Sequence, residues 1–213
     1  MAATKIISIL AVGAGMLAMA TQAHAEEMSG FIDNPTFYVG GSAGRASTDT
    51  GVTDTTGTAS LDEDDTAFKI FGGVNLNKYL AIEGFYADFG EASLSGNNGD
   101  TFTARGTTYT FTANDVNLKL QGKAFGIAPV VGYDVTEYFR PFAKVGIQRW
   151  DLDGSVNTSV GNFDYSETGT DVYYGVGALI SVAEGFGIRA EAERFKFDSE
   201  DVDLISVGLQ YQF

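Results

Sequence analysis

The chain has 213 residues, of which 44% are hydrophobic and 19% charged, and this balance excludes a disordered chain. It contains no cysteine, which excludes disulfides, thiol catalysis and cysteine-held metals. The 28 acidic residues against 13 Lys and Arg give a net charge of −15, so we expect no nucleic-acid partner. Abundant glycine (27 residues) together with 13% aromatics is typical of β-structure.

The first 25 residues have the pattern of an export signal. Lys5 supplies a positive charge, Ile6–Ala20 is an apolar run of 15 residues, and residues 23–25 read Ala-His-Ala, a small-residue cleavage motif. A spanning helix needs about 20 apolar residues, so an uncleaved anchor is the less favoured alternative. We predict a signal peptide over residues 1–25 and one β-barrel domain over residues 26–213.

After residue 35, apolar and polar residues alternate with period two, which separates the two faces of a β-strand. In the last segment, Ile205 and Val207 share one face, whereas Ser206 and Gly208 share the other. The pattern predicts eight strands, at Thr36–Arg45, Thr66–Leu76, Leu80–Phe89, Val116–Tyr133, Phe139–Leu152, Asp171–Val182, Phe186–Phe197 and Val202–Phe213.

The connections between these strands alternate in length. Short turns are predicted at residues 77–79, 134–138 and 183–185, and the other connections are polar stretches at 46–65, 90–115, 153–170 and, much shorter, 198–201. Short turns at one end and longer loops at the other are typical of outer-membrane barrels. The phase of the fourth strand is ambiguous near Pro129, which cannot donate to the ladder, so we expect a bulge there.

The face that carries mid-strand charges is predicted to point into the barrel. A Lys or Arg facing lipid at the midplane costs about 2–4 kcal/mol, whereas an inward one can pair with an acid. The same face is rich in small residues, which suits an interior only just wide enough for its own side chains. Phe37, Phe186, Tyr211 and Phe213 lie on the opposite face near strand ends, as an aromatic girdle would.

Four segments carry a family resemblance by their order and spacing: Thr36–Gly44, Phe71–Gly90, Pro141–Gly146 and Tyr211–Phe213. They resemble the first strand, second hairpin, fifth strand and C-terminal assembly signal of OmpA-type outer-membrane barrels. The resemblance implies an all-β, eight-stranded antiparallel up-and-down transmembrane β-barrel in the bacterial outer membrane. It also implies that the outer-membrane assembly machinery reads Tyr211 and Phe213. The peptidoglycan-binding domain of full-length members has no counterpart here, so tethering to the cell wall is not implied.

The resemblance further implies an ion-pair network inside the barrel. Glu83 and Arg189 match two of its charged members by position, whereas two others fall on the apolar Val131 and Leu179. The candidate lumen residues are Lys69, Glu83, Lys119, Lys123, Lys144, Arg189, Glu191 and Glu193. We favour charges that fill and fix the interior over a conductance gate, because buried charges need partners in either case.

Four basic residues fall on the outward face at the loop ends of their strands: Arg45, Arg149, Arg194 and Lys196. We expect them to bind the phosphates of lipopolysaccharide as an anchoring belt, because charge-assisted pairs with phosphate are strong. The alternative is that they are ordinary interface residues whose charged ends reach the water.

Catalysis is not expected. Some eight-stranded outer-membrane barrels modify lipid A with a catalytic histidine, but residues 26–213 contain no histidine. The acidic runs at residues 62–65 and 198–201 lack EF-hand spacing and are interpreted as solvated loops, so we expect no metal and no cofactor.

Two functions from different classes remain. The favoured one is a structural and surface-interaction protein of the outer membrane, in contact with lipid and lipopolysaccharide, whose loops contact host-surface ligands as an adhesin would. The alternative is a narrow diffusion pore for small solutes, which the filled interior of an eight-stranded barrel disfavours. A soluble lipocalin-like carrier, with the apolar face inside, is a distant third.

Overall fold

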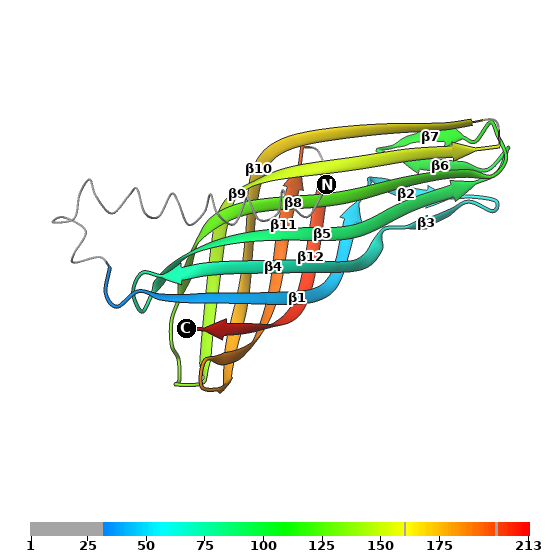
Figure 1. The fold of residues 1–213 in the computed structure, drawn as a ribbon. Helices are drawn as coiled ribbons and strands as arrows, with labels where there is room; N and C mark the ends of the chain where they lie inside the picture. The colour runs from blue at the N-terminus through cyan, green and yellow to red at the C-terminus, as the bar shows by residue number, and fades with distance from the viewer. Residues whose placement is uncertain (1–31, 160, 199) are drawn as a thin grey trace.

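A computed structural model describes residues 32–159, 161–198 and 200–213 of the protein. Eight antiparallel strands close into an up-and-down barrel, which confirms the predicted fold class (Figure 1). The barrel strands are β1 (Thr36–Asp49), β4 (Asp64–Asn75), β5 (Leu80–Gly96), β8 (Val116–Gly132), β9 (Phe139–Thr158), β10 (Gly161–Ala183), β11 (Phe186–Phe197) and β12 (Glu200–Gln212). Pairing of β1 with β12 closes the ring. The predicted signal peptide lies outside the described residues.

The described residues contain no helix that is long and apolar enough to cross a membrane. The barrel wall is instead apolar on the outside: Ile147 is 59% exposed and Val207 58%. On β11 the intervening Arg189, Glu191 and Glu193 are no more than 4% exposed, so the charged face points inward as predicted. This inversion of the usual soluble pattern suits a barrel surrounded by lipid.

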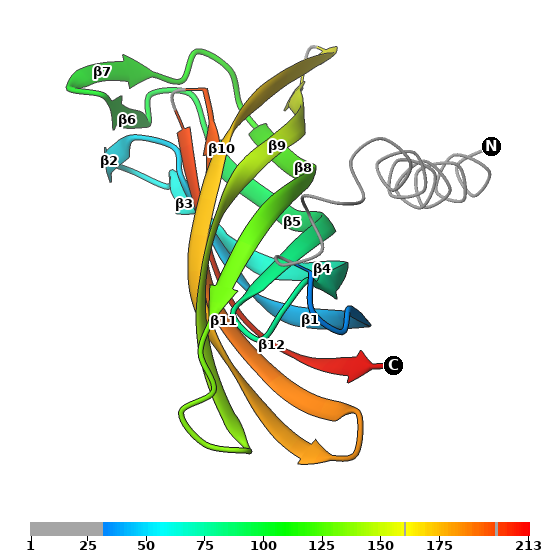
Figure 2. The same cartoon turned by 90° about the vertical axis from the view of Figure 1, so that its left-hand side faces the viewer.

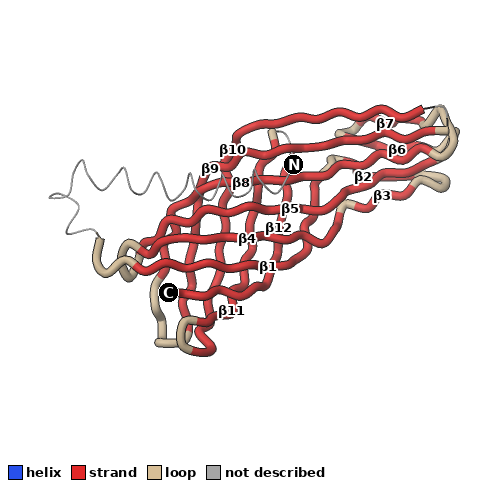
Figure 3. The backbone as a smooth tube through the Cα atoms, viewed as in Figure 1, coloured by secondary structure: helices blue, strands red, loops and turns tan. Residues whose placement is uncertain are grey.

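All eight predicted strands are present, and at the short-turn end their limits agree with the prediction to within one residue. At the opposite end β8 and β11 keep their predicted limits, but other strands run further: β5 ends at Gly96 instead of Phe89, and β10 begins at Gly161 instead of Asp171. Figure 3 shows this continuation as strand along one side of the molecule. The prediction of residues 153–170 as a loop is therefore wrong, because the polar residues of this stretch pair as a hairpin in water.

Beyond the barrel, four short strands complete an extension at the end with the long connections, which in outer-membrane barrels is the extracellular end (Figure 2). By the extracellular extension we mean β2, β3, β6, β7 and the adjoining ends of β5, β8, β9 and β10. β3 (Ser60–Asp62) pairs with β5, while β2 (Val52–Thr55), β6 (Thr101–Ala104) and β7 (Thr107–Thr110) form a separate sheet. Leu94, Phe111 and Val116 form a small apolar core beneath them. The connections predicted at residues 46–65 and 90–115 are thus partly strand.

The irregularity in the barrel wall lies at a different place from the predicted one. The β5–β8 register shifts between Asp88 and Glu91, where Gly90 has a φ of +75°. This left-handed conformation favours glycine. Pro129 faces Ile82 without any shift of that register, so the predicted bulge at Pro129 is wrong. Although the ladder to β9 skips Pro129, the register on either side is continuous, so the missing donor is tolerated without an extra residue.

Candidate functional site

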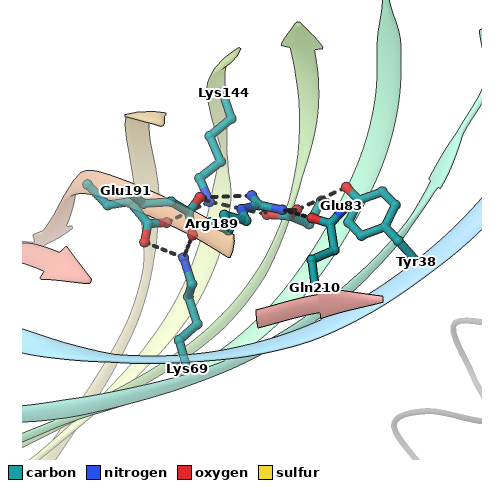
Figure 4. A network of polar contacts seen from close by, with 8 residues as sticks. Tyr38, Lys69, Glu83, Lys144, Arg189, Glu191 and Gln210 are labelled. Carbon is teal, nitrogen blue, oxygen red and sulfur yellow. Dashed lines mark hydrogen bonds and ion pairs between the residues drawn. The ribbon is translucent and has the colours of Figure 1, made fainter. Parts of the chain in front are cut away.

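A connected network of charges crosses the interior of the barrel (Figure 4). Its acids are Glu83 on β5 with Glu191 and Glu193 on β11, and its cations are Lys69 on β4, Lys144 on β9 and Arg189 on β11. None of these six residues is more than 5% exposed. Three negative and three positive charges cancel, which meets the requirement that buried charges be paired.

Arg189 is the centre of the network. Its two terminal nitrogens, Nη1 and Nη2, bind the two Glu83 carboxylate oxygens at 2.6 and 3.0 Å. Nη2 also donates to Glu191 at 2.8 Å, and Nη1 donates to the side-chain oxygen of Gln210 at 3.1 Å. The Glu83 oxygen that binds Nη1, Oε2, also accepts a hydrogen bond of 2.9 Å from the Tyr38 hydroxyl. A bidentate pair of this kind fixes geometry as well as charge.

The two lysines complete the network from other strands. The Lys144 ammonium lies 3.1 Å from Glu83, 2.6 Å from Glu191 and 2.7 Å from Glu193. Lys69 forms ion pairs with Glu191 and Glu193. Each acid therefore touches more than one cation, and the network ties β4, β5, β9 and β11 together across the lumen.

Two aromatic rings enclose the Arg189 guanidinium. Its carbon lies 4.3 Å from the centre of the Phe71 ring and 4.4 Å from that of Phe142, within the range of cation–π attraction. Glycines make room for both rings: a Cβ at Gly40 would lie 2.3 Å from the Phe71 ring, and one at Gly177 would lie 2.5 Å from Phe142. The small inward residues of the sequence thus face large side chains.

An aromatic layer fills the lumen between this network and the extracellular extension. Neighbouring ring centres lie 4.7–5.6 Å apart, and no member is more than 7% exposed. The members are Phe85, Phe89, Trp150, Tyr173, Phe195 and Phe197. This layer was not predicted from the sequence, although the alternation places Phe195 and Phe197 on the same face as Glu193.

On its other side, the network borders an open cavity. This cavity of about 790 Å³ lies at the short-turn end, where Asn77, Asp134 and Arg140 contribute to its lining. Tyr38, Arg189 and Gln210 also line it, so it reaches the charged network. The lumen is therefore accessible from the short-turn end and is filled beyond Arg189.

The structure brings together six of the eight predicted lumen residues, and two predictions are wrong. Lys119 pairs with Glu91 at 2.7 Å near the extracellular extension, and both side chains are 41% exposed. Lys123 lies on the same face of β8 as the exposed Phe125 and Ile127, so it points away from the lumen. The inward face of β8 keeps one phase throughout, which the sequence left ambiguous.

The four outward basic residues are exposed or half-buried on the outer wall, and three of them have acidic partners. Arg45 pairs with Asp64 of the next strand. Arg194 donates two hydrogen bonds to Asp203, at 2.6 and 2.5 Å. Lys196 lies 2.9 Å from Asp201, and Arg149 donates to the Thr168 hydroxyl at 3.4 Å. The predicted belt is thus a set of ion pairs between neighbouring strands.

The residues of the predicted assembly signal lie at the free end of β12. The Tyr211 ring is 4.6 Å from that of Phe186 and 5.0 Å from that of Phe213, and Phe213 is 69% exposed. Their recognition by the assembly machinery stays a prediction. Within the described residues, no group of three or more His, Asp or Glu side chains is placed to hold a metal ion.

Comparison with known proteins decides the family. Residues 9–213 match the family model described as "Outer membrane protein beta-barrel domain". The chain belongs to this family. Membership implies a location in the outer membrane. No match was found among curated proteins.

Three solved structures illustrate the likeness of fold. OprG from Pseudomonas aeruginosa has a TM-score of 0.54 at 8% identity, covering 85% of this chain and 97% of that one. Neisserial surface protein A has a TM-score of 0.52 at 16% identity, covering 85% and 100%. The attachment invasion locus protein Ail of Yersinia pestis, solved with the heparin analogue sucrose octasulfate, has a TM-score of 0.50 at 17% identity, covering 83% and 99%.

Proposed function

We propose that this protein is a structural barrel of the outer membrane whose lumen is sealed and whose extracellular extension serves surface interactions. The observation that carries the proposal is the filling of the lumen by two successive layers, one charged and one aromatic. The alternative, a narrow diffusion pore, requires a continuous aqueous path through both.

The charged layer opposes conduction because its groups already satisfy one another. An ion that crossed would have to separate pairs such as Arg189–Glu83, and breaking a buried pair costs about 3–5 kcal/mol. The aromatic layer opposes conduction for a different reason. Its rings offer no replacement for the hydration shell of an ion, so entry would expose a charge to apolar surface.

One observation favours the pore alternative, namely the cavity at the short-turn end. This cavity ends at Arg189 and Gln210, however, and the aromatic layer lies beyond them. We therefore interpret it as a water-filled vestibule of a closed barrel. We also expect no enzymatic activity, because the buried acids are engaged in ion pairs.

The surface role is supported by the order of the extracellular extension, which has its own apolar core. The extension is also acidic: residues 46–65 contain six Asp or Glu, residues 153–171 contain four, and neither stretch contains Lys or Arg. The Ail structure contains a sulfated heparin analogue. Because like charges repel, we expect partners of this protein to differ from such polyanions.

The test is planar-bilayer conductance of the refolded protein. We expect no channels from the wild type, and none from a Glu83→Ala, Arg189→Ala variant, because the aromatic layer remains. Adding Trp150→Ala, Phe195→Ala and Phe197→Ala to that variant should produce channels. Heat-dependent gel mobility would show that each variant is folded. Reproducible channels in the wild type would overturn the proposal.

A further inference from the structure

One side of β10 has no partner over its extracellular half. Residues 161–180 pair with β9 on one side, but pairing with β11 on the other side begins only at Tyr173. No backbone hydrogen bond joins that second side of residues 161–170 to any described residue. In Figure 1 this part of β10 forms the outer border of the extension. We call residues 161–170 the free edge.

The free edge is long and regular. Ten extended residues span about 34 Å, and every second residue of an antiparallel strand directs its N–H and C=O to the same side. The segment contains no proline and no lysine, the residues that commonly blunt exposed edges, and its register with β9 has no bulge. It is therefore a template on which a further strand can be laid.

The side chains along the free edge restrict which strand would fit. Asp164 and Glu167 are its only charged residues, and both are exposed. Phe163 is 66% exposed and Tyr165 is 43% exposed. Asp171 ends the edge, because its carboxylate accepts hydrogen bonds from the Trp150 indole at 2.9 Å and from the backbone of Asp198 at 3.1 Å.

We propose that the free edge of β10 binds an extended, cationic segment of a partner polypeptide outside the cell by strand addition. Backbone hydrogen bonds would supply the part of the affinity that does not depend on the sequence of the partner. Lys or Arg side chains of the partner would pair with Asp164 and Glu167, and apolar ones would cover Phe163 and Tyr165. This inference rests on the proposed surface role and adds the class of partner to it.

A second copy of this chain fits the edge less well than such a segment. Pairing β10 with β10 of another molecule would place a strand with two acids and no bases against an identical one. Like charges on paired strands destabilise a sheet. The acids thus disfavour self-association while leaving the edge open to a cationic strand.

The experiment measures binding of synthetic ten-residue peptides to the protein in lipid nanodiscs by fluorescence anisotropy. The probe carries a lysine on each of its two faces, because Asp164 and Glu167 lie on opposite faces of β10, and threonine or valine at its other positions. One control peptide replaces each lysine with glutamate, and another is N-methylated at alternate residues so that one edge cannot donate. We expect affinity for the probe to exceed that for either control by about tenfold or more. An Asp164→Lys, Glu167→Lys variant should lose probe binding by a similar factor.

Each other outcome would overturn the inference. Equal binding of the N-methylated peptide would mean simple charge attraction without strand addition. Binding unchanged in the charge-reversal variant would place the peptide elsewhere, and a dimer joined through β10 in the absence of peptide would make a second copy the occupant. Conductance is measured separately, so a sealed barrel without peptide binding contradicts only this inference.

Discussion

Glu83 joins three strands to its own, because it accepts a hydrogen bond from Tyr38 and ion pairs from Lys144 and Arg189. Replacing it with alanine leaves both cations buried with fewer partners. We expect Glu83→Ala to lower the free energy of unfolding by about 3–5 kcal/mol, the usual cost of breaking a buried pair. The measurement is urea unfolding in lipid vesicles, followed by Trp150 fluorescence.

The matched control is Glu91→Ala, which removes the acid of an ion pair whose two side chains are 41% exposed. An exposed pair contributes about 0–1 kcal/mol, so this variant should be close to wild type. Equal losses from the two substitutions would contradict the view that the lumen network holds the barrel together.

Alternation in the sequence predicts which residues face the lumen but not which of them meet. Period-two alternation on one strand predicts that Arg189, Glu191 and Glu193 face the lumen. The same alternation predicts an inward side chain at Phe195. Arg189 and Glu83 are 106 residues apart in the sequence, so their pairing depends on how their strands are placed around the barrel. The family resemblance indicated both residues, whereas the alternation alone could not. Lys123 was misplaced because a continuous apolar run leaves the phase of its strand undetermined.

At the scale of the element, Asp100 holds the extracellular extension together. Its carboxylate accepts hydrogen bonds from the Thr58 hydroxyl at 2.6 Å and from the backbone amides of Asn97 and Thr58 at 2.9 and 3.1 Å. Gly57, with a φ of +74°, approaches so closely that a Cβ there would lie 1.9 Å from the carboxylate. One acid thus joins the connection between β1 and β4 to the connection between β5 and β8.

These hydrogen bonds predict a dependence on pH. The hydrogen bond from the Thr58 hydroxyl has the largest effect and that from the Asn97 amide the next largest, and both lower the pKa of Asp100 below its ordinary value. Because the folded-state pKa is the lower one, the stabilisation is complete above about pH 4 and is lost as the pH falls through the folded value. The hydrogen-exchange protection of residues 97–111, measured against the intrinsic exchange rate at each pH, should therefore fall in acid. The Asp100→Asn variant should have lower protection of these residues at neutral pH, and it should not lose the part of the protection that depends on the Asp100 carboxylate when the pH falls. Identical pH profiles of protection in the variant and the wild type would refute the role of Asp100.

The strands of the barrel were more predictable than those of the extension. Inside the membrane, lipid on one face and a filled lumen on the other impose a strict alternation, as on β11. In the extension both faces meet water or a thin apolar core, so residues such as Thr107–Thr110 alternate weakly and resemble a loop. The aromatic layer was overlooked for a different reason, since an inward phenylalanine was not expected beside buried charges.

For the whole molecule, the distribution of charge differs between lumen and surface. The lumen network is neutral, whereas the outer wall above the apolar zone carries basic residues already paired with acids, as Arg194 is with Asp203. We still propose that this belt binds lipopolysaccharide. Its phosphates, however, would have to compete with the carboxylates for the same cations, so removal of the carboxylates should strengthen the interaction.

Two multiple variants test this competition in opposite directions. Neutralising Arg45, Arg149, Arg194 and Lys196 with glutamine should lower the lipopolysaccharide that co-purifies with the protein severalfold, because charge-assisted contacts are lost. Converting Asp64, Asp201 and Asp203 to asparagine should raise it, since the freed cations then meet phosphate alone. The ratio of phosphate to protein after detergent washing is the measurement. If neither ratio changes, these residues serve only to join neighbouring strands; if both fall, the acids act with the bases, as they would through bridging divalent cations.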